Sequence, residues 1–159
     1  MKMKLTNLEQ DFLDFIRLCN NYNVKYLVIG GYAVAIYGYP RLTKDLDVCI
    51  QVSEENAGKM TQVINDFGLG SLNLKKEDFL TKDFVTQLGY PPVRIDILND
   101  LDAVSFDDAW KKRTVVTISD VAINFIGYDD LLKVKEKAGR KQDIADIEKL
   151  KKRNKLKKQ

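Results

Sequence analysis

Apolar and polar residues follow one another along this chain in short segments that predict interleaved helices and strands. Between residues 6 and 21 apolar side chains recur at helical spacing, with Phe12, Phe15 and Cys19 on one face. Runs rich in Val, Ile and Leu predict strands at residues 26–29, 46–52, 83–88, 93–98, 114–118 and 121–126. The helical pattern returns at residues 32–37, 53–67, 106–112, 128–138 and 143–152. We therefore expect an α/β (α+β) protein with helices flanking a mixed sheet of roughly five strands.

The segment from residue 25 to residue 50, KYLVIGGYAVAIYGYPRLTKDLDVCI, carries the first candidate site. It predicts a strand that ends at Gly30 and Gly31, a short helix, and a second strand that carries Asp45 and Asp47. Glycines at such a turn let the backbone approach a phosphate, and the N–H groups of the following helix point toward it. The pair also suits an ordinary turn that needs positive φ, and it lacks the G-K-[ST] of a Walker A loop.

Asp45 and Asp47 stand two positions apart on a predicted strand, so their side chains point the same way. Adjacent carboxylates repel each other unless a cation or hydrogen bonds lie between them. A divalent metal ion would remove that repulsion. The alternative is an edge strand on which both acids face water.

Asp96 is a third candidate, because it interrupts the apolar run VRIDIL, where an unpaired carboxylate is rarely buried. Its alternative partner is Arg94, which shares its face of the strand. If strand 93–98 lies beside the strand with the other two acids, three carboxylates converge. That arrangement suits two Mg²⁺ ions about 4 Å apart, which clamp the attacking and leaving oxygens of a phosphoryl transfer.

Three polar residues precede the paired acids: Arg41, Thr43 and Lys44. Placed beside a nucleotide, they would contact phosphate oxygens and neutralise charge. The alternative is a solvated loop.

Histidine is absent from all 159 residues, which excludes Ser-His-Asp and Cys-His catalysis and zinc sites that need imidazole. Carboxylate sites suit hard ions, Mg²⁺ first and Mn²⁺ as a possible substitute. Cys19 and Cys49 lie in apolar patterns and are expected to be reduced core thiols of a cytoplasmic protein. No apolar run approaches the roughly 20 residues that cross a bilayer, and the first residues do not form a secretory signal, so no membrane partner is expected.

Charge is distributed unevenly along the chain. Residues 149–159, KLKKRNKLKKQ, hold seven basic residues and no acid, and removing these from the net charge of +3 leaves −4 for the rest. We expect one domain at residues 1–150 and a basic tail at 151–159. The tail is interpreted either as a solvated helix end or as an arm that attracts RNA or another polyanion.

The glycine pair, the R-x-T-x-D-x-D pattern of Arg41 to Asp47, and the later strand with Asp96 resemble the nucleotidyltransferase superfamily with the DNA polymerase β-like fold. The likeness is closest to its small bacterial members. QLGYPPVRIDIL, FDDAW and KVKEKAGRKQDIADIEKL extend it over roughly residues 22–150.

This resemblance implies specific roles for the two motifs. Gly30 and Gly31 would bind the triphosphate, and Asp45 and Asp47 would ligate both metal ions. Asp96 would complete the metal site and accept the proton of the acceptor hydroxyl.

The resemblance also extends to the closing helices. Lys135 would face the triphosphate, while Asp143 and Asp146 would orient Arg140 and Lys141. Ion pairs on a helix surface are the plainer explanation of this cluster.

The implied activity is transfer of a nucleoside monophosphate from an NTP, with ATP the foremost donor, to an acceptor hydroxyl with release of pyrophosphate. The acceptor candidates are an aminoglycoside-like small molecule, the 3′ end of a tRNA and a protein side chain. The alternative function is a non-catalytic nucleotide-binding regulator, or a toxin–antitoxin component with an all-helical partner. A third interpretation is an α/β domain whose acids are structural.

Overall fold

The computed structural model describes residues 10–38, 45–90 and 93–157. The described part contains six strands, seven α-helices and a 3-10 turn. In chain order these are α1 (Gln10–Asn21), β1 (Tyr26–Ile29), α2 (Gly30–Ile36), β2 (Asp45–Ile50), α3 (Glu54–Asp66), the 3-10 turn η2 (Gly70–Leu72), α4 (Lys76–Leu80), β3 (Val85–Tyr90), β4 (Val93–Leu98), α5 (Phe106–Lys111), β5 (Thr114–Ile118), β6 (Val121–Phe125), α6 (Tyr128–Ala138) and α7 (Lys141–Lys157).

The strands form one mixed sheet in the order β3-β4-β2-β1-β6-β5. β2 pairs in parallel with β4, and β1 pairs in parallel with β6, while the remaining pairs are antiparallel. Each outer edge is a hairpin, β3–β4 on one side and β5–β6 on the other. The expected mixed sheet flanked by helices is confirmed, with six strands in the described part where roughly five were expected.

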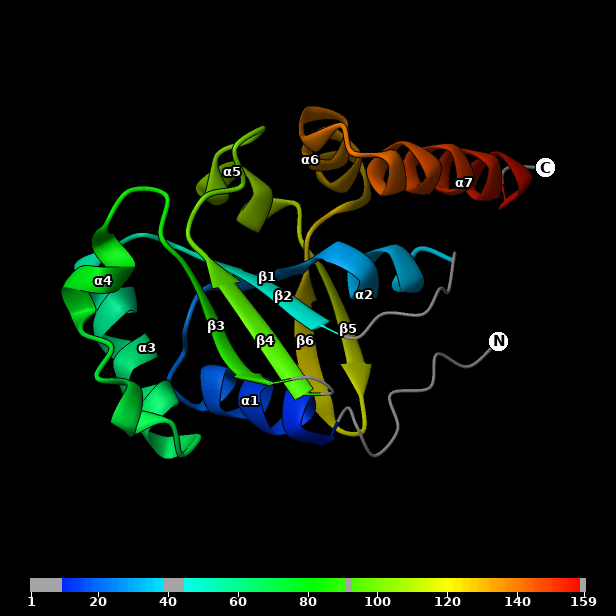
Figure 1. Ribbon diagram of the computed structural model, residues 1–159. Coiled ribbons are helices and arrows are strands. Elements are labelled where there is room, and N and C mark those ends of the chain that lie inside the picture. Colours follow the sequence, from blue (N-terminus) through cyan, green and yellow to red (C-terminus); the bar gives the residue numbers. More distant parts are fainter. Residues whose placement is uncertain (1–9, 39–44, 91–92, 158–159) are drawn as a thin grey trace.

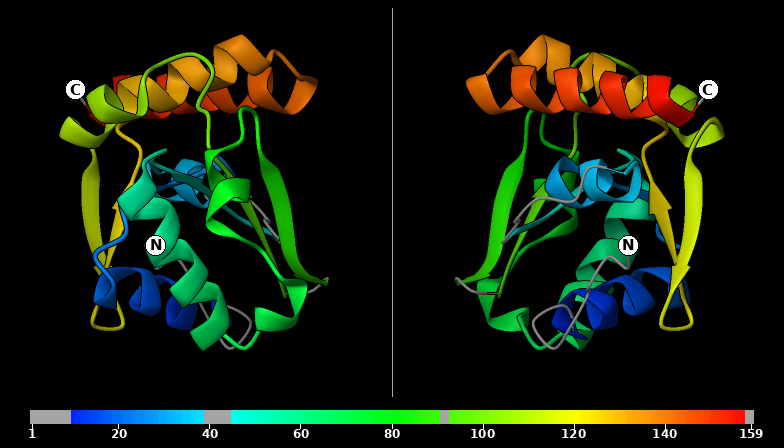
Figure 2. Two further views of the ribbon diagram at one scale, coloured as in Figure 1. Left: turned by 90° about the vertical axis from the view of Figure 1, so that its left-hand side faces the viewer. Right: turned by 90° about the vertical axis from the view of Figure 1, so that its right-hand side faces the viewer.

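Helices cover the sheet from two sides. α6 and α7 run next to each other along one side of the molecule with α2 below them, and α1 and α3 lie on the opposite side of the strands (Figures 1 and 2). None of the helices in the described residues is long and apolar enough to cross a membrane.

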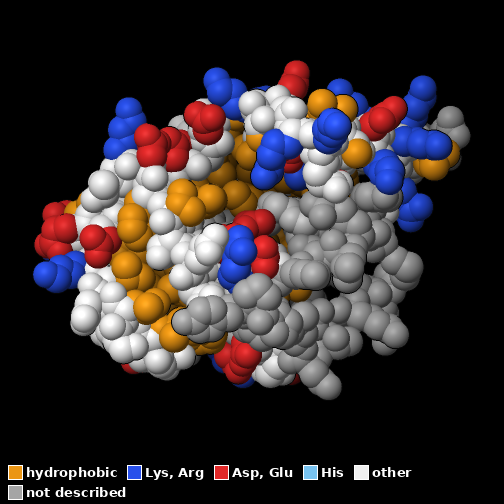
Figure 3. Space-filling model, in the orientation of Figure 1, with side chains coloured by type: hydrophobic (Ala, Val, Ile, Leu, Met, Phe, Trp, Pro, Cys, Tyr) orange, Lys and Arg blue, Asp and Glu red, His pale blue; other side chains and the backbone are white. Residues whose placement is uncertain are grey.

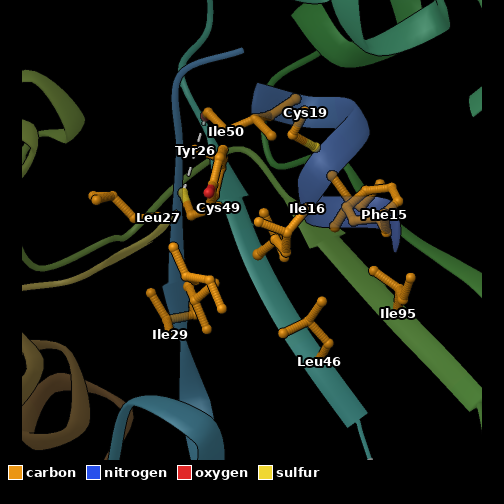
Figure 4. Close-up of a cluster of buried hydrophobic side chains, with 14 of the residues drawn as sticks. Phe15, Ile16, Cys19, Tyr26, Leu27, Ile29, Leu46, Cys49, Ile50 and Ile95 are labelled. Carbon is orange, nitrogen blue, oxygen red and sulfur yellow. Dashed lines mark hydrogen bonds between the residues drawn. The ribbon is translucent and has the colours of Figure 1, made fainter. Parts of the chain in front are cut away.

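The core forms where α1 packs against the central strands. Phe15, Ile16 and Cys19 of α1 are fully buried and face β1, β2 and β4 (Figure 4). This is the apolar helix face that the sequence predicts. Cys19 and Cys49 are both free and buried, and burial raises the pKa of both thiols well above its usual value.

Several boundaries differ from the predicted ones. α2 begins at Gly30 instead of residue 32, because Gly30 adopts a φ of +73° that lets the chain turn at once from strand to helix. α4 and the 3-10 turn were not predicted, since both are too short to show a period. α7 extends to Lys157, across the expected boundary between residues 150 and 151. The predicted start of the first helix at residue 6 lies outside the described residues.

Candidate functional site

Strand pairing brings the three candidate aspartates together. β2 and β4 are parallel neighbours, with Asp47 opposite Asp96 and Asp45 opposite Arg94. Because side chains alternate along a strand, these four residues share one face of the sheet. The condition left open by the sequence, adjacency of the two strands, is therefore met. We call these four residues the aspartate cluster.

Arg94 lies within the aspartate cluster and contacts two of its acids. Its Nε and Nη2 donate hydrogen bonds to the two carboxylate oxygens of Asp96, each at 2.9 Å, and Nη2 lies 3.6 Å from Oδ2 of Asp45. The sequence left open whether Asp96 pairs with Arg94 or meets the other two acids. In the structure Asp96 does both. The exposed fractions of the side chains are 29% for Arg94, 33% for Asp45 and 14% for Asp96, so the cluster opens to solvent. Figure 3 shows basic and acidic side chains gathered beside β2 and β4.

Asp47 is the most strongly perturbed acid of the cluster. Burial raises its pKa to about 7, and the charges of Asp96 and Asp45 and a hydrogen bond with Asp96 act in the same direction. The charge of Arg94 opposes this shift without cancelling it. The cluster therefore carries more negative charge than its own arginine neutralises, which is the condition under which added cations bind.

Gly30 lies directly against the aspartate cluster. A Cβ at this position would overlap the carboxylate of Asp47, and the φ of +73° favours glycine as well. Gly31 is buried in the first turn of α2. Gly30 thus leaves the space that the Asp47 carboxylate occupies. The candidates Arg41, Thr43 and Lys44 lie outside the described residues.

A second charged group joins α6 to α7. The ammonium of Lys135 lies 3.3 Å from Asp143 Oδ1 and 3.0 Å from Asp146 Oδ2, and all three residues are buried. Arg140 donates from its backbone N at 3.2 Å and from Nε at 2.7 Å to Asp143 Oδ2. We call Lys135, Arg140, Asp143 and Asp146 the α6–α7 cluster.

The α6–α7 cluster places Lys135 and Arg140 in different surroundings. Lys135 is enclosed by two carboxylates, whereas the resemblance implies that it faces a triphosphate. The Arg140 side chain is 77% exposed, and its pKa is raised by Asp143 first and also by the charge of Asp47. The charge of Asp47 therefore acts on Arg140, and Asp143 holds the Arg140 guanidinium by accepting hydrogen bonds from Nε and Nη2.

The acids are not yet arranged as metal ligands. Within the described residues no group of three or more Cys, Asp and Glu side chains is positioned to hold a metal ion as it lies. The donor set still fits Mg²⁺, because it offers carboxylate oxygens alone and carries unneutralised negative charge.

Two features of the structure had no counterpart in the sequence interpretation. Asn99 is buried just after β4, where its amide donates to the carbonyls of Phe79 and Thr81 and its Oδ1 accepts from the N–H of Phe84. The signal in the sequence that could have indicated this role is the position of Asn99, a polar residue directly after an apolar strand. The second is a groove of about 580 Å³ between α1, the end of α3 and the β3–β4 hairpin. It is lined by Ile95 and therefore lies on the face of β4 opposite Asp96.

Comparison with solved structures identifies the fold. A protein from Thermotoga maritima assigned as a nucleotidyltransferase has a TM-score of 0.58 at 17% identity, covering 87% of this chain and 88% of its own. Lincomycin-bound LnuA, a lincosamide antibiotic adenylyltransferase, has a TM-score of 0.56 at 16% identity, covering 90% and 96%. The antibiotic-resistance factor ANT(2'')-Ia has a TM-score of 0.54 at 11% identity, covering 91% and 84%. No family model matches the chain, and no curated protein does.

The chain therefore has the fold of small nucleotidyltransferases, which confirms the expectation drawn from the resemblance.

Proposed function

We propose that this protein is a metal-dependent nucleotidyltransferase that moves a nucleoside monophosphate from an NTP to an acceptor hydroxyl. The observation that carries the proposal is the register of β2 and β4, which sets Asp47 beside Asp96 and next to Asp45 on one face. Three carboxylates at one site on this fold supply the charge that two divalent cations require. ATP is the expected donor, and Mg²⁺ is the expected ion, with Mn²⁺ as its substitute.

The residues divide the chemistry between them. Asp45 and Asp47 would hold both ions, and Asp96 would complete the site and take the proton of the acceptor hydroxyl. The ions would supply charge stabilisation at the α-phosphate; the hydroxyl oxygen would bond to the α-phosphorus as the bond to pyrophosphate breaks. Asp47 must lose its proton before it can ligate an ion, so at subsaturating Mg²⁺ the ion should bind more tightly as the pH rises through about 7.

The triphosphate would extend from the aspartate cluster toward the glycine turn and the α6–α7 corner. Gly30 lets the Asp47 carboxylate lie close to the backbone at that turn, and Arg140 offers an exposed guanidinium on which the charge of Asp47 acts. Lys135 would act indirectly, since it fixes Asp143, which in turn bonds Arg140.

The first test is an assay of transfer from an α-labelled NTP by wild type and by Asp47→Asn. We expect the substitution to lower Mg²⁺-dependent transfer by about a hundredfold or more, because it removes a ligand shared by both ions. Glu136→Gln is the matched control, since it neutralises an exposed acid on α6. Equal activity of Asp47→Asn and wild type would refute the proposal, provided that both unfold at similar temperatures.

Two observations bear on the acceptor. LnuA is a lincosamide antibiotic adenylyltransferase and ANT(2'')-Ia is an antibiotic-resistance factor, which favours a small molecule as the acceptor. The outer end of α7 carries exposed basic side chains (Figure 3), and Arg153 lies against Gly38, just before the segment that leads to Asp45. This basic end favours RNA, because lysine and arginine attract phosphates without reading sequence.

Salt dependence separates these acceptors. If RNA binds along α7, the triple substitution Lys151→Gln, Lys152→Gln and Lys155→Gln should weaken tRNA binding and flatten its dependence on salt concentration. A salt dependence equal to that of wild type would leave α7 as a solvated helix end. Transfer to an antibiotic, unchanged by the same substitutions, would identify a small-molecule acceptor.

A non-catalytic nucleotide-binding regulator is the second candidate. It is favoured by Arg94, which partly neutralises the aspartate cluster without a metal ion. Nucleotide binding without turnover on any acceptor would support it, and a helical protein partner that binds this chain would point to a toxin–antitoxin component.

A further inference from the structure

Arg94 and Asp96 enclose one side of the aspartate cluster. Both carboxylate oxygens of Asp96 accept hydrogen bonds from Arg94, at 2.9 Å each. The same guanidinium reaches Oδ2 of Asp45 at 3.6 Å. These are oxygens that a cation shared by β2 and β4 would use.

Charge-assisted bidentate pairing of this kind is among the stronger polar contacts in proteins. Each Asp96 oxygen gives one of its lone pairs to Arg94, so a divalent ion that approaches Asp96 from the side of the guanidinium can ligate it only after Arg94 has moved. The Arg94 side chain is 29% exposed, so its guanidinium can rotate toward solvent and away from the sheet.

We propose that Arg94 is the resident counterion of the aspartate cluster, and that divalent cations bind by displacing it. This inference rests on the proposed function, because it takes the aspartates as the metal site. Arg94 is here a positioning residue: it keeps Asp96 and Asp45 in place before the ions arrive and competes with those ions for the same two acids.

Competition lowers the apparent affinity for the ion. Part of the binding free energy of the ion is consumed in breaking the contacts of Arg94, so the metal-free state is stabilised at the expense of the metal-bound state. Removing the guanidinium should therefore have opposite effects on the two states. The metal-free protein should unfold at a lower temperature, and the ion should bind more tightly.

The test is a titration with Mn²⁺ alone at pH 8, in which free Mn²⁺ is measured by electron paramagnetic resonance. Arg94→Gln should bind Mn²⁺ about tenfold more tightly than wild type, and saturating Mn²⁺ should raise its unfolding temperature more. Arg94→Lys keeps the charge but loses the planar fork, so its affinity should lie between the two. It also tests the proposal if the glutamine variant does not fold.

Lys76→Gln is the matched control, because it breaks an exposed ion pair with Glu54 on a different part of the chain. Its Mn²⁺ affinity should equal that of wild type. An Mn²⁺ affinity of Arg94→Gln and Arg94→Lys that is equal to or weaker than that of wild type would overturn the inference.

The same titration separates this inference from the proposed function. If wild type binds Mn²⁺ and Asp47→Asn does not, the metal site stands whatever Arg94 does. If neither wild type nor Arg94→Gln binds Mn²⁺, the metal site itself fails, and the counterion role fails with it.

Discussion

The aspartate cluster and the α6–α7 cluster are built from the same kinds of side chain and differ in balance and exposure. The α6–α7 cluster has two bases and two acids, and the side chains of Lys135, Asp143 and Asp146 are 6%, 1% and 0% exposed. The aspartate cluster has three acids and one base and opens to solvent. Only the α6–α7 cluster balances its own charges.

The pKa values follow from this difference. Burial alone would raise the pKa of Asp143, but hydrogen bonds and charges from Arg140 and Lys135 hold it below its usual value. Asp47 is also mostly buried, but its nearest neighbours are acids, and its pKa rises to about 7. A closed and balanced cluster stabilises the fold, whereas an open and unbalanced one is prepared to receive cations.

The largest effect should come from breaking the balanced cluster. Lys135→Met removes the buried cation that Asp143 and Asp146 share, which should lower the free energy of unfolding by about 3–5 kcal/mol. Urea denaturation measures this directly. Lys137→Met, at an exposed position of the same helix, should change stability by no more than about 0.5 kcal/mol. Equal effects of the two substitutions would contradict the structural role of the cluster.

Substitution of Asp47 should have a smaller effect on stability, and in the opposite direction. The pKa of Asp47 is about 7 in the folded protein and 3.8 in an unfolded chain, so between these pH values the folded protein holds a proton that the unfolded chain has lost. The resulting stability is fully present below pH 3.8 and is lost as the pH rises through 7. In EDTA, we expect this loss to appear as a fall in the free energy of unfolding of wild type between pH 4 and pH 8.

Asp47→Asn should remove that component of the pH dependence and be the more stable protein at pH 8. Urea denaturation of both proteins between pH 4 and pH 8 is the measurement. Parallel pH profiles for the two proteins would show that Asp47 does not titrate in this range.

The smallest change in stability is expected at Asp45, which is one-third exposed and shares Arg94 with Asp96. Asp45→Asn in EDTA should alter the free energy of unfolding by less than about 1 kcal/mol. It should nevertheless abolish the stabilisation that Mn²⁺ gives to wild type, which differential scanning fluorimetry measures. Retention of the full Mn²⁺ response would remove Asp45 from the metal site.

Much of this arrangement is readable in the sequence. The apolar runs predict segments that overlap all six strands, although the sheet was expected to have roughly five. The pairing of Asp45 with Asp47 on one face follows from the period of a strand. The single Asp96 in an apolar run signals a carboxylate with a partner.

The remainder depends on which strands are neighbours, and that is set by packing of the whole chain. Asp96 reaches Asp47 only because β4 lies beside β2, a pairing that no local pattern encodes. The surroundings of Lys135 also depend on packing of the whole chain. The resemblance implies a triphosphate beside Lys135, and α7 folds back and places two acids around it. The double contact of Arg94 with Asp96 and Asp45 likewise spans two strands.

The parallel pairing of β2 with β4 has a consequence for synthesis of the chain. On the ribosome, Asp45 and Asp47 emerge long before β4, and closing so long a loop makes this contact a late one in folding. The newly made β2 therefore carries two acids without a third. When the β3–β4 hairpin docks, it delivers Asp96 and Arg94 in the same step, so the last negative charge arrives already paired.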